Sequence, residues 1–389
     1  MRGTFRRRGR RRVARGVASV LMCVFAAASC GPAAATPTPP PPTAEATAEP
    51  TDTPLPGVTS ITITPAPRKN DTIASTAKSQ NRYFGTAVQV DPLDYDDRYA
   101  SYVASDFSSV TVEYAMRWNI VEPSQDEFNW DGADAIVAWA GSRGIKVRGQ
   151  PLVWYLQLPA WLTNGQFDQA TLAQLLEKHV TDEVGHFAGK IASWDVVTDP
   201  LNENGTLRSS LWSQVLGPDY IARVLQWAHA ADPAAKLYIN ESNAEGLGVK
   251  SDALFNFVKA LKTRGVPIDG VGLTTHLDAT KKGVLPPGMG SNVQRFGGIG
   301  VEVAYTALDV RMHSPPLPDE PPQQLNLYRT AVRACFTQPA CVGITVWGFT
   351  DRYSWIAQTY PGFGEADLFD AKIYRKVDLV QIVKEAMLP

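Results

Sequence analysis

The chain is long and apolar enough to form a large folded domain. It has 389 residues, of which 44% are hydrophobic and 10% aromatic, and this composition excludes a wholly disordered chain. Four cysteines are too few for a small scaffold held together by disulfides. The formal net charge is −2, although eight arginines lie within the first 15 residues. Without them 29 basic residues face 39 acidic ones, so we expect no basic groove and no nucleic-acid partner.

The first 29 residues have the pattern of a secretory signal peptide. An arginine-rich start precedes an apolar stretch (16–28), and small residues come before Cys30. The order Ala-Ala-Ser-Cys at 27–30 resembles a bacterial lipobox and predicts that Cys30 becomes the lipidated first residue of the mature protein. The alternative is an ordinary secretory signal that leaves Cys30 as a free thiol. Both interpretations predict an extracytoplasmic protein, secreted or at the cell surface, that touches the membrane only through a lipid.

Residues 30–70 form a proline- and threonine-rich segment. They hold eleven of the 29 prolines and few large apolar side chains, so they cannot pack a core. This composition predicts a disordered or extended tether. Residues 71–389 contain no second segment of this kind, and we therefore expect them to form one domain.

Short β-rich segments alternate with amphipathic helical segments along this domain. The eight predicted strands cover residues 83–88, 110–113, 146–151, 193–198, 237–240, 270–275, 301–307 and 343–347. The predicted helices between them include 133–142, 170–187, 220–231, 253–263 and 323–334, with Asp131 and Asp219 as start signals for two of these. Eight strand–helix units predict an α/β fold, a parallel (β/α)8 TIM barrel. A doubly wound open sheet is the alternative, but no glycine-rich phosphate loop follows the first strand.

The predicted strand ends carry aromatic, amide and carboxylate side chains. In a (β/α)8 barrel, chemistry belongs at the carboxyl ends of the strands. The side chains found there are those of Glu113, Trp154, Asp199, Asn240, Glu241, His276 and Trp347. Aromatic faces stack on sugar rings while carboxylates and amides bind hydroxyls, so this set favours a sugar-polymer site. Aromatic residues could instead only close the barrel top, but Trp154, Trp347 and Trp355 together favour a site.

Several short motifs occur in a fixed order over the whole domain. They are Tyr-Phe-Gly-Thr-Ala-Val at 83–88, Val-Thr-Val-Glu at 110–113, Leu-Val-Trp at 152–154, Trp-Asp-Val-Val at 194–197, Leu-Gly-Pro-Asp-Tyr-Ile at 216–221, His-Leu at 276–277, Leu-Asp-Val-Arg-Met at 308–312 and Gly-Ile-Thr-Val-Trp-Gly at 343–348, continuing through Asp351 to Ser354 and Trp355. With these motifs the chain resembles glycoside hydrolase family 10, the endo-β-1,4-xylanases. The resemblance implies a (β/α)8 barrel, xylan or a related β-1,4-glycan as ligand, and no cofactor or metal. It also implies a disulfide between Cys335 and Cys341.

The two catalytic positions of this family are altered. Its members use two glutamates about 5–5.5 Å apart, one as acid/base and one as nucleophile. The acid/base glutamate ends the family motif Trp-Asp-Val-Val-Asn-Glu, and here Thr198 and Asp199 stand at its last two positions. The nucleophile of the motif Thr-Glu-Leu-Asp is replaced by Ala307. Ala307 cannot attack an anomeric carbon and Asp199 is one methylene shorter than glutamate, so we expect hydrolysis to be impaired or lost.

Other sugar-binding positions of the family are also changed. Asparagine, lysine, two histidines and glutamine are replaced by Tyr114, Arg117, Gln150, Tyr155 and Thr274. The resemblance implies a substrate-binding set made of Glu113, Tyr114, Arg117, Gln150, Trp154, Gln157, Thr198, His276, Trp347 and Trp355.

Three functions remain open at this point. The first is a tethered, monomeric β-glycan-binding protein with little or no hydrolysis. The second is an active endo-β-1,4-xylanase or other β-glycosidase in polysaccharide degradation, with a rewired mechanism in which Asp278 or Glu241 is the base for a water-mediated inverting route. The third is a barrel that binds a protein partner and no sugar. Trp347 and Trp355 favour the first two functions, and Ala307 favours the first over the second.

Overall fold

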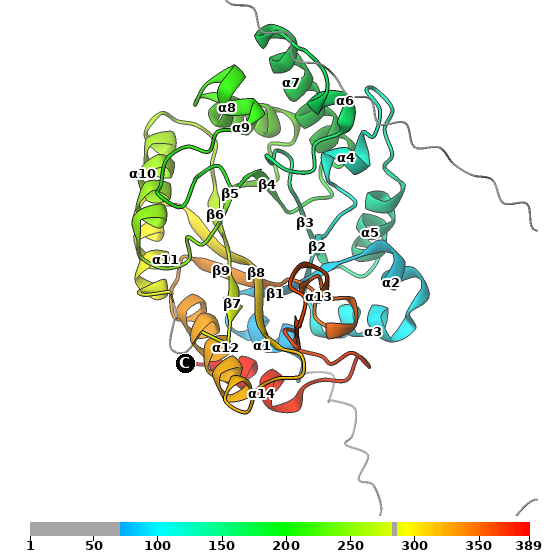
Figure 1. The fold of residues 1–389 in the computed structure, drawn as a ribbon, viewed down its shortest axis with the longest axis vertical. Coiled ribbons are helices and arrows are strands. Elements are labelled where there is room, and N and C mark those ends of the chain that lie inside the picture. The colour runs from blue at the N-terminus through cyan, green and yellow to red at the C-terminus, as the bar shows by residue number, and fades with distance from the viewer. Residues whose placement is uncertain (1–70, 282–285) are drawn as a thin grey trace, which may run out of the picture. The chain divides into compact units, whose positions relative to one another are not determined.

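The computed structural model describes residues 71–281 and 286–389 (Figure 1). Cys30, the predicted signal peptide and the predicted tether lie outside these residues. Within the described part of the chain, no helix is long and apolar enough to cross a membrane.

Eight strands close into a parallel barrel, as the sequence predicts. They are β1 (Tyr83–Val88), β2 (Ser109–Val112), β3 (Lys146–Gly149), β4 (Ser193–Thr198), β5 (Lys236–Ser242), β6 (Gly270–Thr274), β8 (Glu302–His313) and β9 (Cys341–Val346). Neighbours in the barrel follow chain order from β1 to β6, and β6 pairs with β8. The barrel closes because β9 pairs with β8 on one side and with β1 on the other. An open sheet is therefore excluded.

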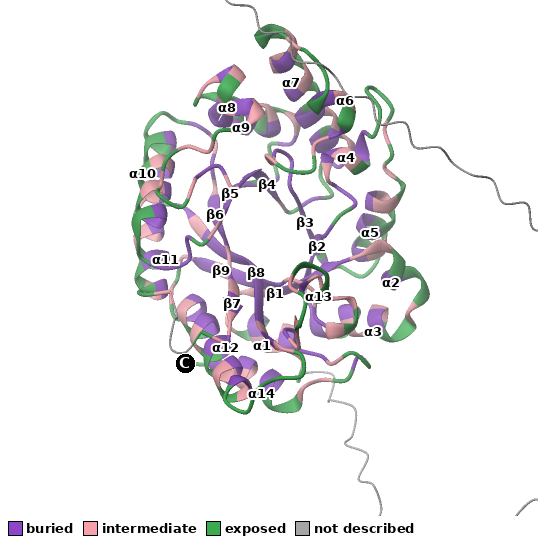
Figure 2. Cartoon of the chain, in the orientation of Figure 1, coloured by how far each residue is buried: buried purple, intermediate pink, exposed green. Residues whose placement is uncertain are grey.

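Helices surround this barrel, and their bounds follow the chain. They are α1 (Ile73–Ser79), α2 (Val90–Tyr95), α3 (Asp97–Asp106), α4 (Trp118–Val121), α5 (Asp131–Gly141), α6 (Ala160–Thr163), α7 (Gln169–His186), α8 (Leu211–Leu216), α9 (Tyr220–Ala231), α10 (Val249–Thr263), α11 (Met289–Gly298), α12 (Glu320–Phe336), α13 (Ile356–Thr359) and α14 (Val377–Met387). The strands are buried almost throughout (Figure 2), as expected where helices cover a parallel sheet.

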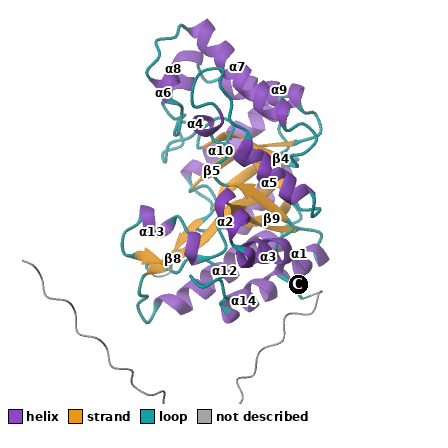
Figure 3. Cartoon of the chain, turned by 90° about the vertical axis from the view of Figure 1, so that its right-hand side faces the viewer, coloured by secondary structure: helices purple, strands orange, loops and turns teal. Residues whose placement is uncertain are grey.

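Strand boundaries differ from the predicted ones mainly at the site. The third strand ends at Gly149, because Pro151 has no N–H to donate to a neighbouring strand. Strand β8 runs six residues past Ala307, and two short strands, β7 (His276–Asp278) and β10 (Phe363–Gly364), pair with this extension. Figure 3 shows β8 and α13 on the side of the barrel away from α1. The extension therefore stands on the same side as the carboxyl ends of the barrel strands.

A disulfide joins Cys335, near the end of α12, to Cys341, at the start of β9. Their Cα atoms are 5.3 Å apart and both residues are buried. The predicted pairing is confirmed.

A buried ion pair lies inside the barrel between β3 and β4. Arg148 Nε donates to Asp195 Oδ2 at 2.9 Å, and Arg148 Nη2 donates to Asp195 Oδ1. The two side chains are only 3% and 2% exposed, and the guanidinium lies 4.3 Å from the ring centroid of Tyr238 on β5. Each charge therefore depends on the other for compensation, since water does not reach them.

We expect Arg148→Met to lower the free energy of unfolding by about 3–5 kcal/mol, because it leaves the Asp195 carboxylate buried and unpaired. Urea denaturation followed by circular dichroism measures this loss. The double variant Arg148→Met/Asp195→Leu removes both charges and should recover much of it. A loss below about 1 kcal/mol in the single variant would contradict the assignment.

Candidate active site

The nucleophile position lies on β8, beside a histidine held by a buried aspartate. Ala307 is 3% exposed, and Asp309, two residues further along, is fully buried. The register of β7 and β8 sets His276 opposite Asp309. His276 Nδ1 donates to Asp309 Oδ2 at 2.7 Å, since an ionised carboxylate can only accept. Trp355 Nε1 donates to the same oxygen at 2.9 Å, so one carboxylate fixes both side chains.

Two tryptophans flank the His276 imidazole. Its ring centroid lies 4.7 Å from that of Trp355 and 6.5 Å from that of Trp347, which follows β9. All three side chains are partly exposed. The structure thus brings together the aromatic residues that the sequence indicated, next to a residue, Ala307, that carries no carboxylate.

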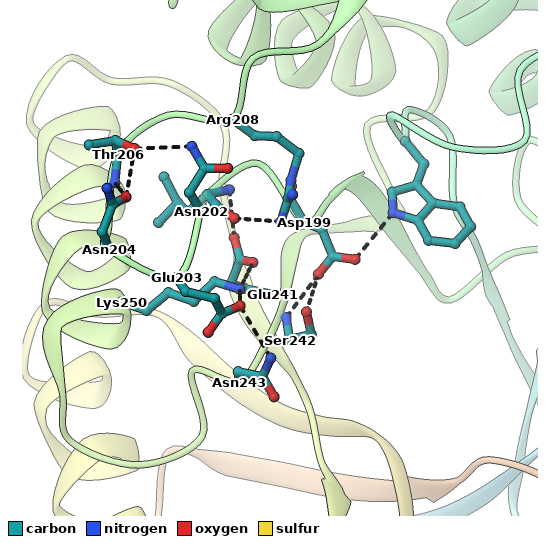
Figure 4. Close-up of polar contacts among 12 residues, drawn as sticks. Asp199, Asn202, Glu203, Asn204, Thr206, Arg208, Glu241, Ser242, Asn243 and Lys250 are labelled. Carbon is teal, nitrogen blue, oxygen red and sulfur yellow. Dashed lines mark hydrogen bonds and ion pairs between the residues drawn. The ribbon is translucent and has the colours of Figure 1, made fainter. Parts of the chain in front are cut away.

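The acid/base position, Asp199, is surrounded by hydrogen-bond donors. Its Oδ2 accepts from Trp154 Nε1 at 3.1 Å, and its Oδ1 accepts from the backbone N and the Oγ of Ser242 at 3.0 and 2.7 Å (Figure 4). The backbone of Asp199 is fixed as well, because its carbonyl accepts from Arg208 Nε at 2.8 Å. Three donors on one carboxylate support its ionised form, whereas a general acid has to give a proton away.

Glu113, Tyr114, Arg117 and Gln157 form a connected cluster beside Trp154. Arg117 Nη1 donates to Gln157 Oε1 at 2.6 Å, and Arg117 Nε donates to the Glu113 carbonyl at 3.1 Å. Its guanidinium lies 4.4 Å from the Tyr114 ring centroid and 5.9 Å from that of Trp154. Burial raises the pKa of Glu113, whose Oε2 accepts from Gln89.

Little space remains beside this cluster. The cavity there is only about 10 Å³, lined by Arg117, Trp118, Pro151, Leu152, Trp154, Leu156, Gln157 and Leu158. That volume holds about one water molecule. The side chains of this region therefore pack against one another.

Two other predicted binding residues are largely enclosed. Gln150 is 6% exposed, and its Nε2 donates to the carbonyls of Val112 and Glu113 at 2.8 and 3.2 Å. Thr198 is 9% exposed, at the end of β4. Gln150 therefore also joins the ends of β2 and β3.

Neither candidate base of the inverting route is free to activate a water. Glu241 is fully buried, with Lys250 Nζ 2.9 Å from its Oε1 and the Leu201 N–H donating to its Oε2. Burial raises the pKa of Glu241 to about 8, against the opposing charge of Lys250. Asp278 accepts from Thr280 and from Arg311 Nη2 at 2.7 Å. Although burial acts in the other direction, these hydrogen bonds lower the pKa of Asp278.

Sequence reasoning did not identify several residues that shape the site. Gln89 directly follows β1, so the strand-end rule could have identified it. Arg208 and Lys250 lie in a loop and a helix far from the residues they bind, and nothing in the sequence indicates these contacts. In the described residues, no group of three or more His, Cys, Asp or Glu side chains is arranged to hold a metal ion.

Comparisons with known proteins agree with this architecture. The family model "Glycosyl hydrolase family 10" matches residues 72–385. The chain is 41% identical over 301 residues to an endo-1,4-beta-xylanase of Agaricus bisporus, covering 77% of this chain and 89% of the relative. It is also 41% identical over 303 residues to endo-1,4-beta-xylanase A of Phanerodontia chrysosporium, covering 77% and 73% of the two chains.

Solved structures give the same result. Native xylanase 10B of Thermotoga maritima superposes with a TM-score of 0.78 at 32% identity, covering 81% of this chain and 98% of that one. Xylanase 10B of Thermotoga petrophila, solved in complex with xylobiose, gives 0.79 at 32% identity, covering 83% and 98%. By its sequence, its motifs and its barrel, this chain belongs to glycoside hydrolase family 10.

Proposed function

We propose that this protein recognises xylan or a related β-1,4-linked glycan on the carboxyl-end face of its barrel, and that it hydrolyses the chain poorly or not at all. The observation that carries the proposal is the arrangement of His276, Trp347 and Trp355 around Asp309, beside an alanine. Aromatic faces that would stack on sugar rings are retained, while the position of the attacking carboxylate is empty of chemistry. The complex of the Thermotoga petrophila enzyme with xylobiose supports this class of ligand.

The contacts of the nearby carboxylates support the loss of hydrolysis. A retaining glycosidase needs one carboxylate to attack the anomeric carbon and a second carboxyl group to protonate the leaving oxygen. On β8 the carboxylate nearest to Ala307 in sequence is that of Asp309, which is fully buried and already accepts from His276 and Trp355. Asp199 accepts from three donors. The first role is therefore unfilled, and the second is opposed by its surroundings.

The proposal includes an extracytoplasmic location with a lipid anchor at Cys30. The arginine-rich start, the apolar stretch and the small residues before Cys30 support it. A proline-rich tether after the lipid would separate the barrel from the membrane.

If Cys30 is lipidated, the full-length protein should partition with membranes and incorporate a radioactive fatty acid when expressed in a bacterium. Cys30→Ala should abolish both the label and the membrane partitioning. A soluble wild-type protein whose N-terminus lies elsewhere, or partitioning unchanged in Cys30→Ala, would contradict the anchor.

If the tryptophans form the sugar platform, xylo-oligosaccharides should quench tryptophan fluorescence in a saturable manner. Trp347→Ala should weaken binding by about 1–3 kcal/mol, the contribution of one aromatic contact. Trp227→Phe, on the outer helix α9, is the matched control and should leave the affinity unchanged. No saturable binding of any β-glycan at millimolar concentration would favour the third function, a barrel without a sugar ligand.

Long incubation with xylo-oligosaccharides, followed by mass spectrometry, should release no shorter sugars above a buffer control. Restoring both glutamates in the double variant Ala307→Glu/Asp199→Glu should not restore xylan hydrolysis, because Tyr114, Tyr155 and Gln150 also differ from the family pattern. For the same reason azide should not accelerate cleavage of an aryl β-xylobioside. Appreciable rescue by either treatment would show that Ala307 is the decisive change, and release of sugar by the untreated protein would contradict the proposal itself.

A further inference from the structure

We propose that the glycan-binding surface continues past the barrel mouth onto an outer ledge, made of Tyr95, Arg352 and Tyr353, and that this ledge holds the outer sugar units of the same β-1,4-linked chain. This inference rests on the proposed function, since the inner part of that chain lies on Trp347 and Trp355. It concerns residues that neither the family motifs nor the strand-end rule select.

Tyr95 offers an unoccupied aromatic face at the barrel mouth. It is the last residue of α2, the helix that follows β1, and its side chain is 66% exposed. Among the residues that the structure describes, the Tyr95 ring stacks on no other aromatic ring and covers no cation. A single exposed tyrosine is common on protein surfaces, so the argument depends on what connects Tyr95 to the site.

Tyr353 provides that connection. It lies two residues before Trp355, and its hydroxyl donates to Asp96 Oδ2 at 2.8 Å, next to Tyr95 in the chain. The carbonyl of Tyr353 accepts from Gln89 Nε2 at 3.1 Å, and the same amide donates to Glu113 Oε2 at 3.0 Å. A continuous set of direct contacts therefore runs from Glu113, in the predicted binding set, to the residue beside Tyr95.

The ledge is held rigidly, which lowers the entropy cost of binding to it. The Tyr353 ring meets that of Tyr99 edge to face, with centroids 5.4 Å apart. Asp96 is the N-cap of α3 and also accepts from the Tyr99 N–H at 3.1 Å. One carboxylate thus fixes both the start of α3 and the position of the Tyr353 hydroxyl.

The chemistry of the ledge suits a neutral polysaccharide. The exposed Arg352 lies with its guanidinium 5.4 Å from the Tyr353 ring centroid, and it supplies N–H donors for sugar hydroxyls. Asp94 and Asp97 flank Tyr95 and Asp96, so the local charge repels a polyanion such as nucleic acid. Aromatic faces with donors and acceptors at their edges are the features that a sugar chain requires.

A second exposed tyrosine nearby differs in one respect that makes it a control. Tyr374 is 53% exposed, but the Arg98 guanidinium lies 4.7 Å from its ring centroid and thus covers one face. Arg98 is in turn held by a hydrogen bond from its Nη1 to the Lys372 carbonyl at 3.1 Å. Tyr374 therefore resembles Tyr95 in residue type and exposure, yet it is not part of the ledge.

The test compares oligosaccharides of two lengths by titration calorimetry on the wild-type barrel and three variants. Xylohexaose should bind the wild-type protein more tightly than xylotriose, because only the longer chain reaches the ledge. Tyr95→Ala should weaken xylohexaose binding by about three- to tenfold, the size of one aromatic contact, and leave xylotriose binding unchanged. Tyr95→Phe keeps the ring and Tyr374→Ala leaves the ledge intact, so both should retain the wild-type gain with length. Melting temperatures establish that each variant is folded.

Each remaining outcome identifies what has failed. Equal affinity for the two lengths, or a gain with length that survives in Tyr95→Ala, would overturn the ledge and leave the proposed function standing. Binding of neither oligosaccharide would overturn both. A sedimentation coefficient that falls in Tyr95→Ala would show that the ledge is a contact with a second copy of this chain, which also overturns the proposal.

Discussion

Closure of the barrel is the constraint on which the whole site depends. β9 pairs with β1 on one side and with β8 on the other, so eight parallel strands end on one common face. Side chains that are far apart in the sequence meet there only because of this closure. His276 and Asp309 are 33 residues apart, yet their side chains are 2.7 Å apart. The buried pair Arg148–Asp195 links β3 and β4 inside the same barrel.

The charges around the barrel mouth are committed to holding the structure. Asp309 binds His276 and Trp355, Asp199 binds Trp154 and Ser242, and Glu241 pairs with Lys250. Each buried carboxylate has a partner that would be left uncompensated by its removal. This gives a physical reason for the order of the mouth in a chain whose nucleophile position is alanine. It also explains why the aromatic surface keeps its form independently of the chemistry.

Binding and catalysis place different demands on this face. Hydrolysis requires two carboxyl groups free to attack and to protonate, whereas recognition requires aromatic faces and polar edges in fixed positions. Trp347, Trp355 and the outer ledge meet the second demand without the first. The cluster of Arg117, Gln157 and Tyr114 fills space beside Trp154 with side chains that bind one another. A family 10 barrel can on this basis serve as a scaffold for recognition.

The sequence by itself determined the barrel, the number and order of its strands, the helix at 220–231 and the pairing of Cys335 with Cys341. Hydrophobic periodicity and short motifs are local properties, so they can be read without knowing what packs where. Ala307 and Asp199 were likewise identified from motifs alone. Only the tertiary structure decided how far β8 extends, that Glu241 is enclosed with Lys250, and that Asp199 accepts from three donors. These features depend on contacts between segments far apart in the chain, and the burial and hydrogen bonding of a carboxylate exist only once the strands have closed around it.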